Sequence, residues 1–219
     1  MRLLSINRAR SIWFLYLIDL NPRGLNLFSI MQPMINKYKF LPVKPDELDL
    51  TKGVVFGRGS FINADEKEIA VDLTIFNDGF VADTRSSTNE SDAFLDEFIS
   101  WIAMEYQLIP YQEVIRSKTY LSELWVKTDK HLNTLNPKLE QFGKHLTSMI
   151  KGHNHHPIEF ETTGISFWTN PTITLPPGPF RFERGIDTPF GENRYFSIAP
   201  LQTDAHLELL DELEKILSN

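Results

Sequence analysis

Alternation of apolar and polar side chains over residues 69–76 constrains the fold more than any other feature of this sequence. Every second residue from Ile69 to Ile75 is a bulky aliphatic, with Asp72 and Thr74 among the residues between. This period of two is typical of a β-strand with one buried face. Asn77-Asp78-Gly79 follows, and these residues tolerate positive φ. The chain is therefore predicted to return over residues 80–84 as an antiparallel hairpin, the end of a meander that starts near residue 54.

Amphipathic helices are predicted on either side of further short strands. Apolar residues recur at spacings of three and four over residues 92–107 and again over residues 205–217. The same spacing over residues 25–38 favours a helix, in which Pro33 is expected to cause either a kink or a start near Gln32. Strands are predicted at residues 119–128, 159–168, 180–184 and 194–199. The expected fold class is α+β, with an antiparallel sheet or sheets and amphipathic helices packed on one face.

A helix is also predicted over residues 137–150, with a stripe at heptad spacing. Such a stripe faces either the protein's own core or a second copy of the chain, so a homodimer is an open alternative. The stripe consists of Leu132, Leu135, Leu139, Phe142, Leu146 and Met149.

Two regions of the chain differ in charge. Residues 1–30 carry four arginines against Asp19, a charge of +3, and subtracting this from the whole-chain value of −7 leaves −10 for the remainder. The basic and apolar segment 1–30 is interpreted as a buried strand, with a targeting-like or membrane-surface extension over residues 1–18 as the alternative. Residues 31–219 are predicted to form a single α+β domain, or two sheet-plus-helix halves that meet near residues 108–118.

Composition excludes several classes of function. The acidic body repels nucleic acid, and the apolar run that ends at Asp19 is too short to cross a bilayer. The chain has no cysteine, so disulfides, thiolate metal sites and thiol nucleophiles are all excluded. We expect neither nucleic acid nor a membrane as partner, and we expect the protein to be cytoplasmic.

Histidines at positions 153, 155 and 156 form the densest group of metal-ligating side chains. Imidazoles at this spacing can bind a first-row metal ion. However, His153, His155 and His156 follow a helix-stopping glycine and precede Pro157, a pattern typical of a solvated loop. We therefore expect no metal and no cofactor, with this cluster as the weaker alternative.

An arginine-rich and aromatic segment near the C-terminus is the principal candidate site. Alternation places Phe180 and Phe182 on one face of a strand and Arg181 on the other, with Arg184, Arg194 and Tyr195 close in sequence. Arginines among aromatic residues are typical of protein interfaces and of anion sites. Arg–Glu pairing on the strand surface is the simpler alternative, because Glu183 and Glu192 are equally near.

The expected function is that of a non-catalytic protein-binding module, such as an adaptor, a chaperone-like protein or an inhibitor. No nucleophile elbow, phosphate loop, metalloprotease motif or calcium loop is present in the sequence. The partner is expected to be another protein. The alternative is a hydrolase or transferase that uses one of these arginines to hold an anionic group.

Overall fold

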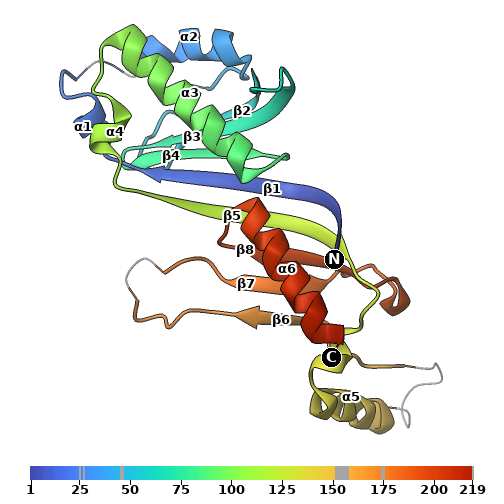
Figure 1. Ribbon diagram of the computed structural model, residues 1–219. Helices are drawn as coiled ribbons and strands as arrows, with labels where there is room; N and C mark the ends of the chain where they lie inside the picture. The colour runs from blue at the N-terminus through green and yellow to red at the C-terminus, as the bar shows by residue number, and fades with distance from the viewer. Residues whose placement is uncertain (25, 27, 45–46, 151–157, 174–175, 219) are drawn as a thin grey trace. The chain divides into compact units, whose positions relative to one another are not determined.

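The computed structural model describes residues 1–24, 26, 28–44, 47–150, 158–173 and 176–218. These residues form both strands and helices (Figure 1). The strands in these ranges are β1 (Arg2–Phe14), β2 (Val54–Ile62), β3 (Glu68–Phe76), β4 (Gly79–Thr84), β5 (Ser117–Lys127), β6 (Gly164–Phe167), β7 (Phe180–Arg184) and β8 (Arg194–Ala199). The α-helices are α1 (Leu17–Leu20), α2 (Phe28–Tyr38), α3 (Thr88–Tyr106), α4 (Tyr111–Val114), α5 (Pro137–Ile150) and α6 (Thr203–Ser218). The predicted α+β class is confirmed.

The chain divides into two compact units. Unit 1 contains residues 1–5, 123–199 and 204–219, and unit 2 contains residues 6–122 and 200–203. Residues of the long strands β1 and β5 therefore contribute to both units.

Unit 2 is built on the predicted meander. β2, β3 and β4 pair antiparallel in sequence order, and β4 pairs on its other side with β1. Residues 54–62 form one strand, with a bulge between Phe56 and Gly59 at which Arg58 has φ 58°. α3 and α2 cover the same face of these strands (Figure 1).

Two helices in unit 2 differ from their predicted bounds. Of the two alternatives for residues 25–38, the start near Gln32 is wrong: α2 begins at Phe28 and Pro33 lies inside it. α3 begins at Thr88, earlier than predicted, because the Ser87 hydroxyl caps it by accepting a hydrogen bond from the backbone N of Glu90 at 3.2 Å. The polar first turn of α3 is buried: Thr88 and Ser91 have no exposed surface.

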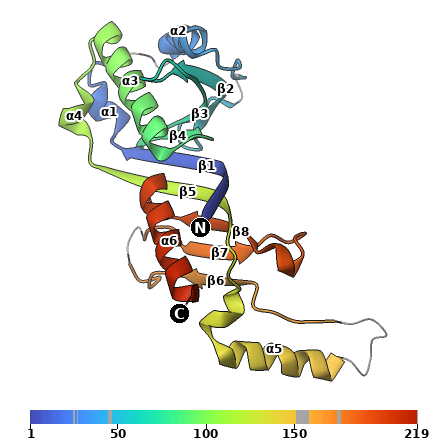
Figure 2. The same cartoon turned by 45° about the vertical axis from the view of Figure 1, so that its right-hand side comes forward.

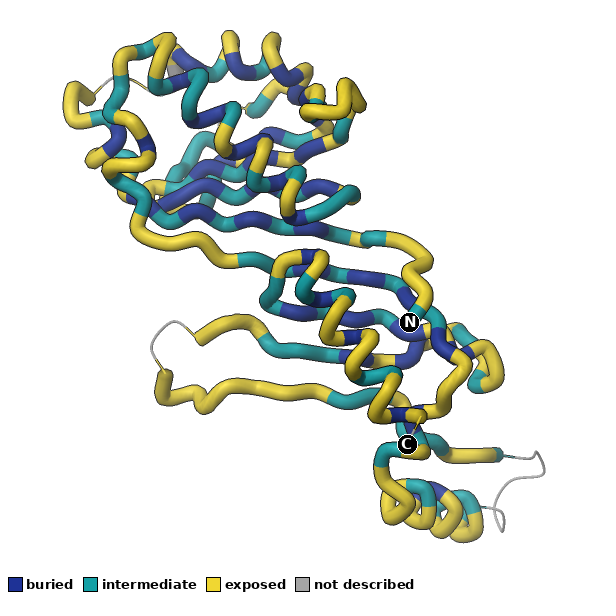
Figure 3. The backbone as a smooth tube through the Cα atoms, in the orientation of Figure 1, coloured by how far each residue is buried: buried dark blue, intermediate teal, exposed yellow. Residues whose placement is uncertain are grey.

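Unit 1 has strands in the order β5-β8-β7-β6, with α6 lying across them (Figures 1 and 2). β7 and β8 have the predicted bounds, whereas β6 covers only Gly164–Phe167 of the strand predicted at residues 159–168. α5 forms as predicted, but the part of the heptad stripe that lies on it is not buried, whereas Leu132, which precedes the helix, is buried. Leu139, Phe142 and Met149 are about half exposed or more, and Gly143 is the buried residue of this helix (Figure 3).

The two halves of the chain repeat one order of elements. β1, α2, β2, β3, β4 and α3 are followed by β5, α5, β6, β7, β8 and α6, and the strand order is β2-β3-β4-β1 in the first half and β6-β7-β8-β5 in the second. Phe80–Thr84 and Tyr195–Ala199 share the same alternation of buried and half-buried residues. The same offset of 115 residues relates Thr88 to Thr203 at the starts of α3 and α6. No repeat was visible in the sequence.

Within the described ranges, no helix has both the length and the apolar character that a membrane span requires.

Candidate functional site

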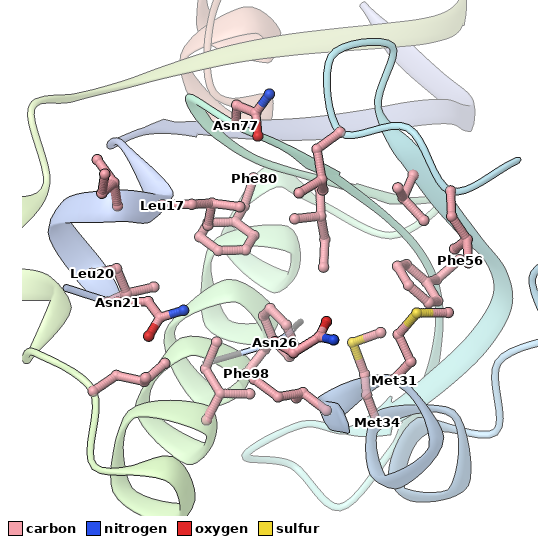
Figure 4. Close-up of a pocket in the computed structure, with 18 of the residues that line it drawn as sticks. Leu17, Leu20, Asn21, Asn26, Met31, Met34, Phe56, Asn77, Phe80 and Phe98 are labelled. Carbon is pink, nitrogen blue, oxygen red and sulfur yellow. The ribbon is translucent and has the colours of Figure 1, made fainter. Parts of the chain in front are cut away.

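A cavity of about 460 Å³ within unit 2 has mostly apolar walls, and we call it the apolar cavity (Figure 4). Its walls come from α1, α2, the loop before β2, the strands β2–β4 and α3. Its volume lies in the range of about 300–1,000 Å³ that is usual for small-molecule sites. The lining residues are Leu17, Ile18, Leu20, Asn21, Gly24, Asn26, Ile30, Met31, Met34, Leu48, Asp49, Leu50, Val54, Phe56, Ile75, Asn77, Phe80, Phe98, Ile102 and Leu108.

The floor and the mouth of the apolar cavity differ in chemistry. Its buried lining residues are all apolar, and they include Met34, Phe56 and Phe80. The polar lining residues, three asparagines and Asp49, are exposed or half-buried. A ligand would therefore place its apolar part on the floor and meet hydrogen-bonding groups only near solvent.

The turn between β3 and β4 holds two segments of the cavity wall in place. The backbone N of Asn77 donates to the carbonyl O of Leu50 at 3.2 Å, and the backbone N of Leu17 donates to the carbonyl O of Asn77 at 2.9 Å. Gly53, the residue before β2, has φ +88°, and a Cβ there would collide with the ring of Phe76. These backbone contacts fix the loop before β2 and helix α1 at the cavity.

The predicted arginine and aromatic residues of unit 1 separate onto two faces of its strands. Arg181, Glu183 and Phe196 share one face, while Phe182, Arg184 and Tyr195 share the other, because paired residues of antiparallel strands point the same way. Phe180 belongs with the second group, and its ring contacts His206 of α6 with centroids 6.2 Å apart. Phe182 and Tyr195 are fully buried and stack at 4.4 Å.

The outward face carries the arginines that remain accessible. Arg181 stacks on Trp168 at 5.2 Å and Arg194 stacks on Trp125 at 4.8 Å. Trp125 also contacts Phe196, with ring centroids 5.1 Å apart. We call these five residues the Arg–Trp face. Trp125 and Trp168 were not among the predicted site residues, because both lie outside the segment 180–196 and reach it only through strand pairing.

Arg184 is buried, with 3% of its side chain exposed. Its guanidinium donates to the carbonyl O of Phe190, to Glu161 Oε2 at 3.3 Å and to the hydroxyl of Tyr195 at 3.4 Å, and its Nε has no partner in the described structure. Burial raises the pKa of Tyr195 and keeps its hydroxyl neutral. Arg184 also borders a second cavity, of about 490 Å³, together with Thr163, Ile165 and others.

The structure does not bring the three guanidiniums into one site. Arg184 lies on the face opposite Arg181. Arg181 and Arg194 share a face, but Arg181 pairs with Ile198, four residues along β8 from Arg194, which corresponds to about 13 Å of strand. Each guanidinium instead has its own aromatic partner.

Metal-ligating groups do not cluster in the described part of the chain, where no set of three or more His, Asp or Glu side chains could hold an ion. His153, His155 and His156 lie outside the described residues.

The fold repeat shows why the two cavities differ in polarity. Ile75 pairs with Phe80 in the first half, and Arg184 pairs with Tyr195 at the equivalent place in the second half. Ile75 and Phe80 line the apolar cavity, whereas Arg184 lines the second one. The same position of the fold thus borders an apolar cavity in one half and a charged one in the other.

Comparison with known proteins gave no match, either to a protein-family model or to a curated protein.

Proposed function

We propose that this protein binds a small apolar molecule in the apolar cavity of unit 2, as a non-catalytic binding protein. The observation that carries this proposal is the purely apolar floor of a cavity with the volume of a typical ligand site. Apolar binding is favourable here, because each buried methylene of a ligand contributes about 0.8 kcal/mol. The two methionines on α2, Met31 and Met34, supply flexible side chains that adapt to ligand shape.

The lining residues support binding over catalysis. Among the described residues that line the cavity, Asp49 is the only one with an ionisable side chain. Its Oδ1 accepts hydrogen bonds from the hydroxyl and backbone N of Thr51 at 2.6 and 2.9 Å, and its Oδ2 is 3.2 Å from Lys52 Nζ. General acid–base chemistry needs a second group of matched pKa in reach of the same ligand, and the described wall offers none.

A cavity-filling variant tests the proposal. Met31→Trp places an indole at the wall, and we expect it to weaken binding of the neutral dye Nile red at least tenfold in a fluorescence titration. Gln32→Trp is the matched control, since Gln32 is exposed on the same helix and does not line the cavity. Equal dye binding by both variants and the wild type, with all three folded by circular dichroism, would refute the proposal.

A second function is favoured by the Arg–Trp face. Trp168 is 65% exposed, and β6 stands at the end of the strand order of unit 1. Exposed tryptophan beside arginine is the composition of an interface hot spot, and an end strand can pair with an added strand. We propose that this face binds an extended segment of another protein.

The test of this second function compares the partners that three variants capture. Cross-linked partners from the native host should be lost in Trp168→Ala and in Arg181→Ala, and they should be retained in Phe142→Ala, which removes an equally exposed ring from α5. Retention of the same partners by all three variants would count against the Arg–Trp face.

A further inference from the structure

The polar end of the ligand can be inferred from the charges around the apolar cavity; this inference rests on the proposed function. Of the described residues that line the cavity, none is a lysine, an arginine or a histidine. The carboxylate of Asp49 is the single charged group among these described lining residues. Hydrogen bonds from Thr51 lower the pKa of Asp49, with a further contribution from Lys52, so it stays ionised at neutral pH.

Two basic residues, Lys52 and Arg23, are close in sequence to lining residues but do not line the cavity themselves. Lys52 pairs with Asp49 and is itself 83% exposed. Arg23, which lies in sequence between the lining residues Asn21 and Gly24, donates to Gln107 Oε1 at 3.3 Å. Neither side chain lines the cavity, so an anionic head group at the mouth would find an acid there and no lining cation.

The remaining polar groups are amides. Asn21 and Asn26 line the cavity from the connection between α1 and α2, and Asn77 lines it from the β3–β4 turn (Figure 4). Each primary amide offers both a donor and an acceptor. This combination suits a hydroxyl or amide head group, which also donates and accepts, and it does not offset the desolvation of a carboxylate or phosphate.

We propose that the ligand is an uncharged amphiphile, with an aliphatic chain on the apolar floor and a hydroxyl or amide group at the asparagines. Fatty acids and phosphate-headed lipids are thereby excluded as preferred ligands. An amine is disfavoured too, because the carboxylate of Asp49 is already shared by Thr51 and Lys52.

Three probes of equal chain length test this inference at pH 7.5: decanol, decanoate and decylamine, each displacing Nile red. We expect decanol to bind at least tenfold more tightly than decanoate and more tightly than decylamine. Decanoate or decylamine binding as tightly as decanol would overturn the inference while leaving the proposed function intact. If none of the three binds and Nile red does not bind either, the proposed function itself fails.

A second experiment adds a positive charge at the mouth of the apolar cavity. Asn77→Lys adds a positive charge at an exposed lining position, and we expect it to raise the affinity for decanoate at least fivefold relative to decanol. Ala64→Lys is the matched control, with the same charge change at an exposed residue of unit 2 that does not line the cavity. An equal gain in both variants would show a general electrostatic effect and refute the role of the mouth.

Discussion

Thr88 and Thr203 hold each other through two reciprocal hydrogen bonds. The backbone N of Thr88 donates to Oγ1 of Thr203 at 3.0 Å, and the backbone N of Thr203 donates to Oγ1 of Thr88 at 2.8 Å. Both threonines are buried, and each is the first residue of its helix, where the backbone N has no partner within the helix. Each side chain therefore satisfies a donor that would otherwise be buried without a partner.

Replacement of Thr88 by valine tests these reciprocal hydrogen bonds. Thr88→Val keeps the shape but removes the acceptor of the Thr203 amide, and an unsatisfied buried donor costs about 1–3 kcal/mol of unfolding free energy. Amide hydrogen exchange checks it residue by residue: the Thr203 amide should exchange faster in Thr88→Val, while the Thr88 amide stays protected. Unchanged protection of Thr203 would contradict the reciprocal bonds.

His206 should make the protein less stable in mild acid. The ring is fully buried, and its Nε2 lies 2.8 Å from the hydroxyl of Ser197, which donates to the carbonyl O of Arg181 at 3.0 Å. Burial lowers the pKa of His206 from 6.5 to about 4. Above pH 6.5 the ring is neutral in both the folded and unfolded states, so its contribution to stability is complete there.

Between pH 6.5 and about 4 the unfolded chain takes up a proton that the folded chain does not. Stability should therefore fall through this window, by about 3 kcal/mol at about 1.4 kcal/mol per pH unit. Urea denaturation at several pH values measures the slope. The slope should be reduced in His206→Leu and unaffected in His145→Gln, which replaces an exposed histidine. If the unfolding free energy depended on pH equally in wild type and in His206→Leu, the pH dependence would not come from His206.

Replacing Glu161 alone should lower the unfolding free energy more than replacing both Glu161 and Arg184 with apolar residues. Glu161→Leu leaves the Arg184 guanidinium buried with one fewer acceptor, and we expect it to lose about 2–3 kcal/mol of unfolding free energy. The double variant Arg184→Met with Glu161→Leu should recover most of that loss, since an apolar Ile75 already occupies the equivalent position of the first half. Chemical denaturation of the single and double variants measures the coupling. A double variant less stable than Glu161→Leu alone would contradict this prediction.

Local signals in the sequence were sufficient for much of the fold. Alternation and Asn77-Asp78-Gly79 define the β3–β4 hairpin, and the bounds of β7 and β8 follow from alternation alone. The start of α3 was missed because its first turn buries Thr88 and Ser91 through hydrogen bonds, and no apolar period marks such residues.

Sites formed by distant segments could not be predicted in the same way. The apolar cavity combines residues from Leu17 to Leu108, and no short window contains its pattern. The partners of Arg181 and Arg194, Trp168 and Trp125, are set by strand pairing. The fold repeat is not visible in the sequence, because equivalent positions share burial rather than residue identity. Phe80 and Tyr195 are one such pair, and Ser91 and His206 are another.

The repeated order of elements gives this chain two versions of one framework. A substitution at Ile75 changes a wall of one cavity, whereas a substitution at Arg184 changes the wall of the other, and neither requires the framework itself to be rebuilt. The lining of one cavity can therefore change in size or charge while the lining of the other stays the same.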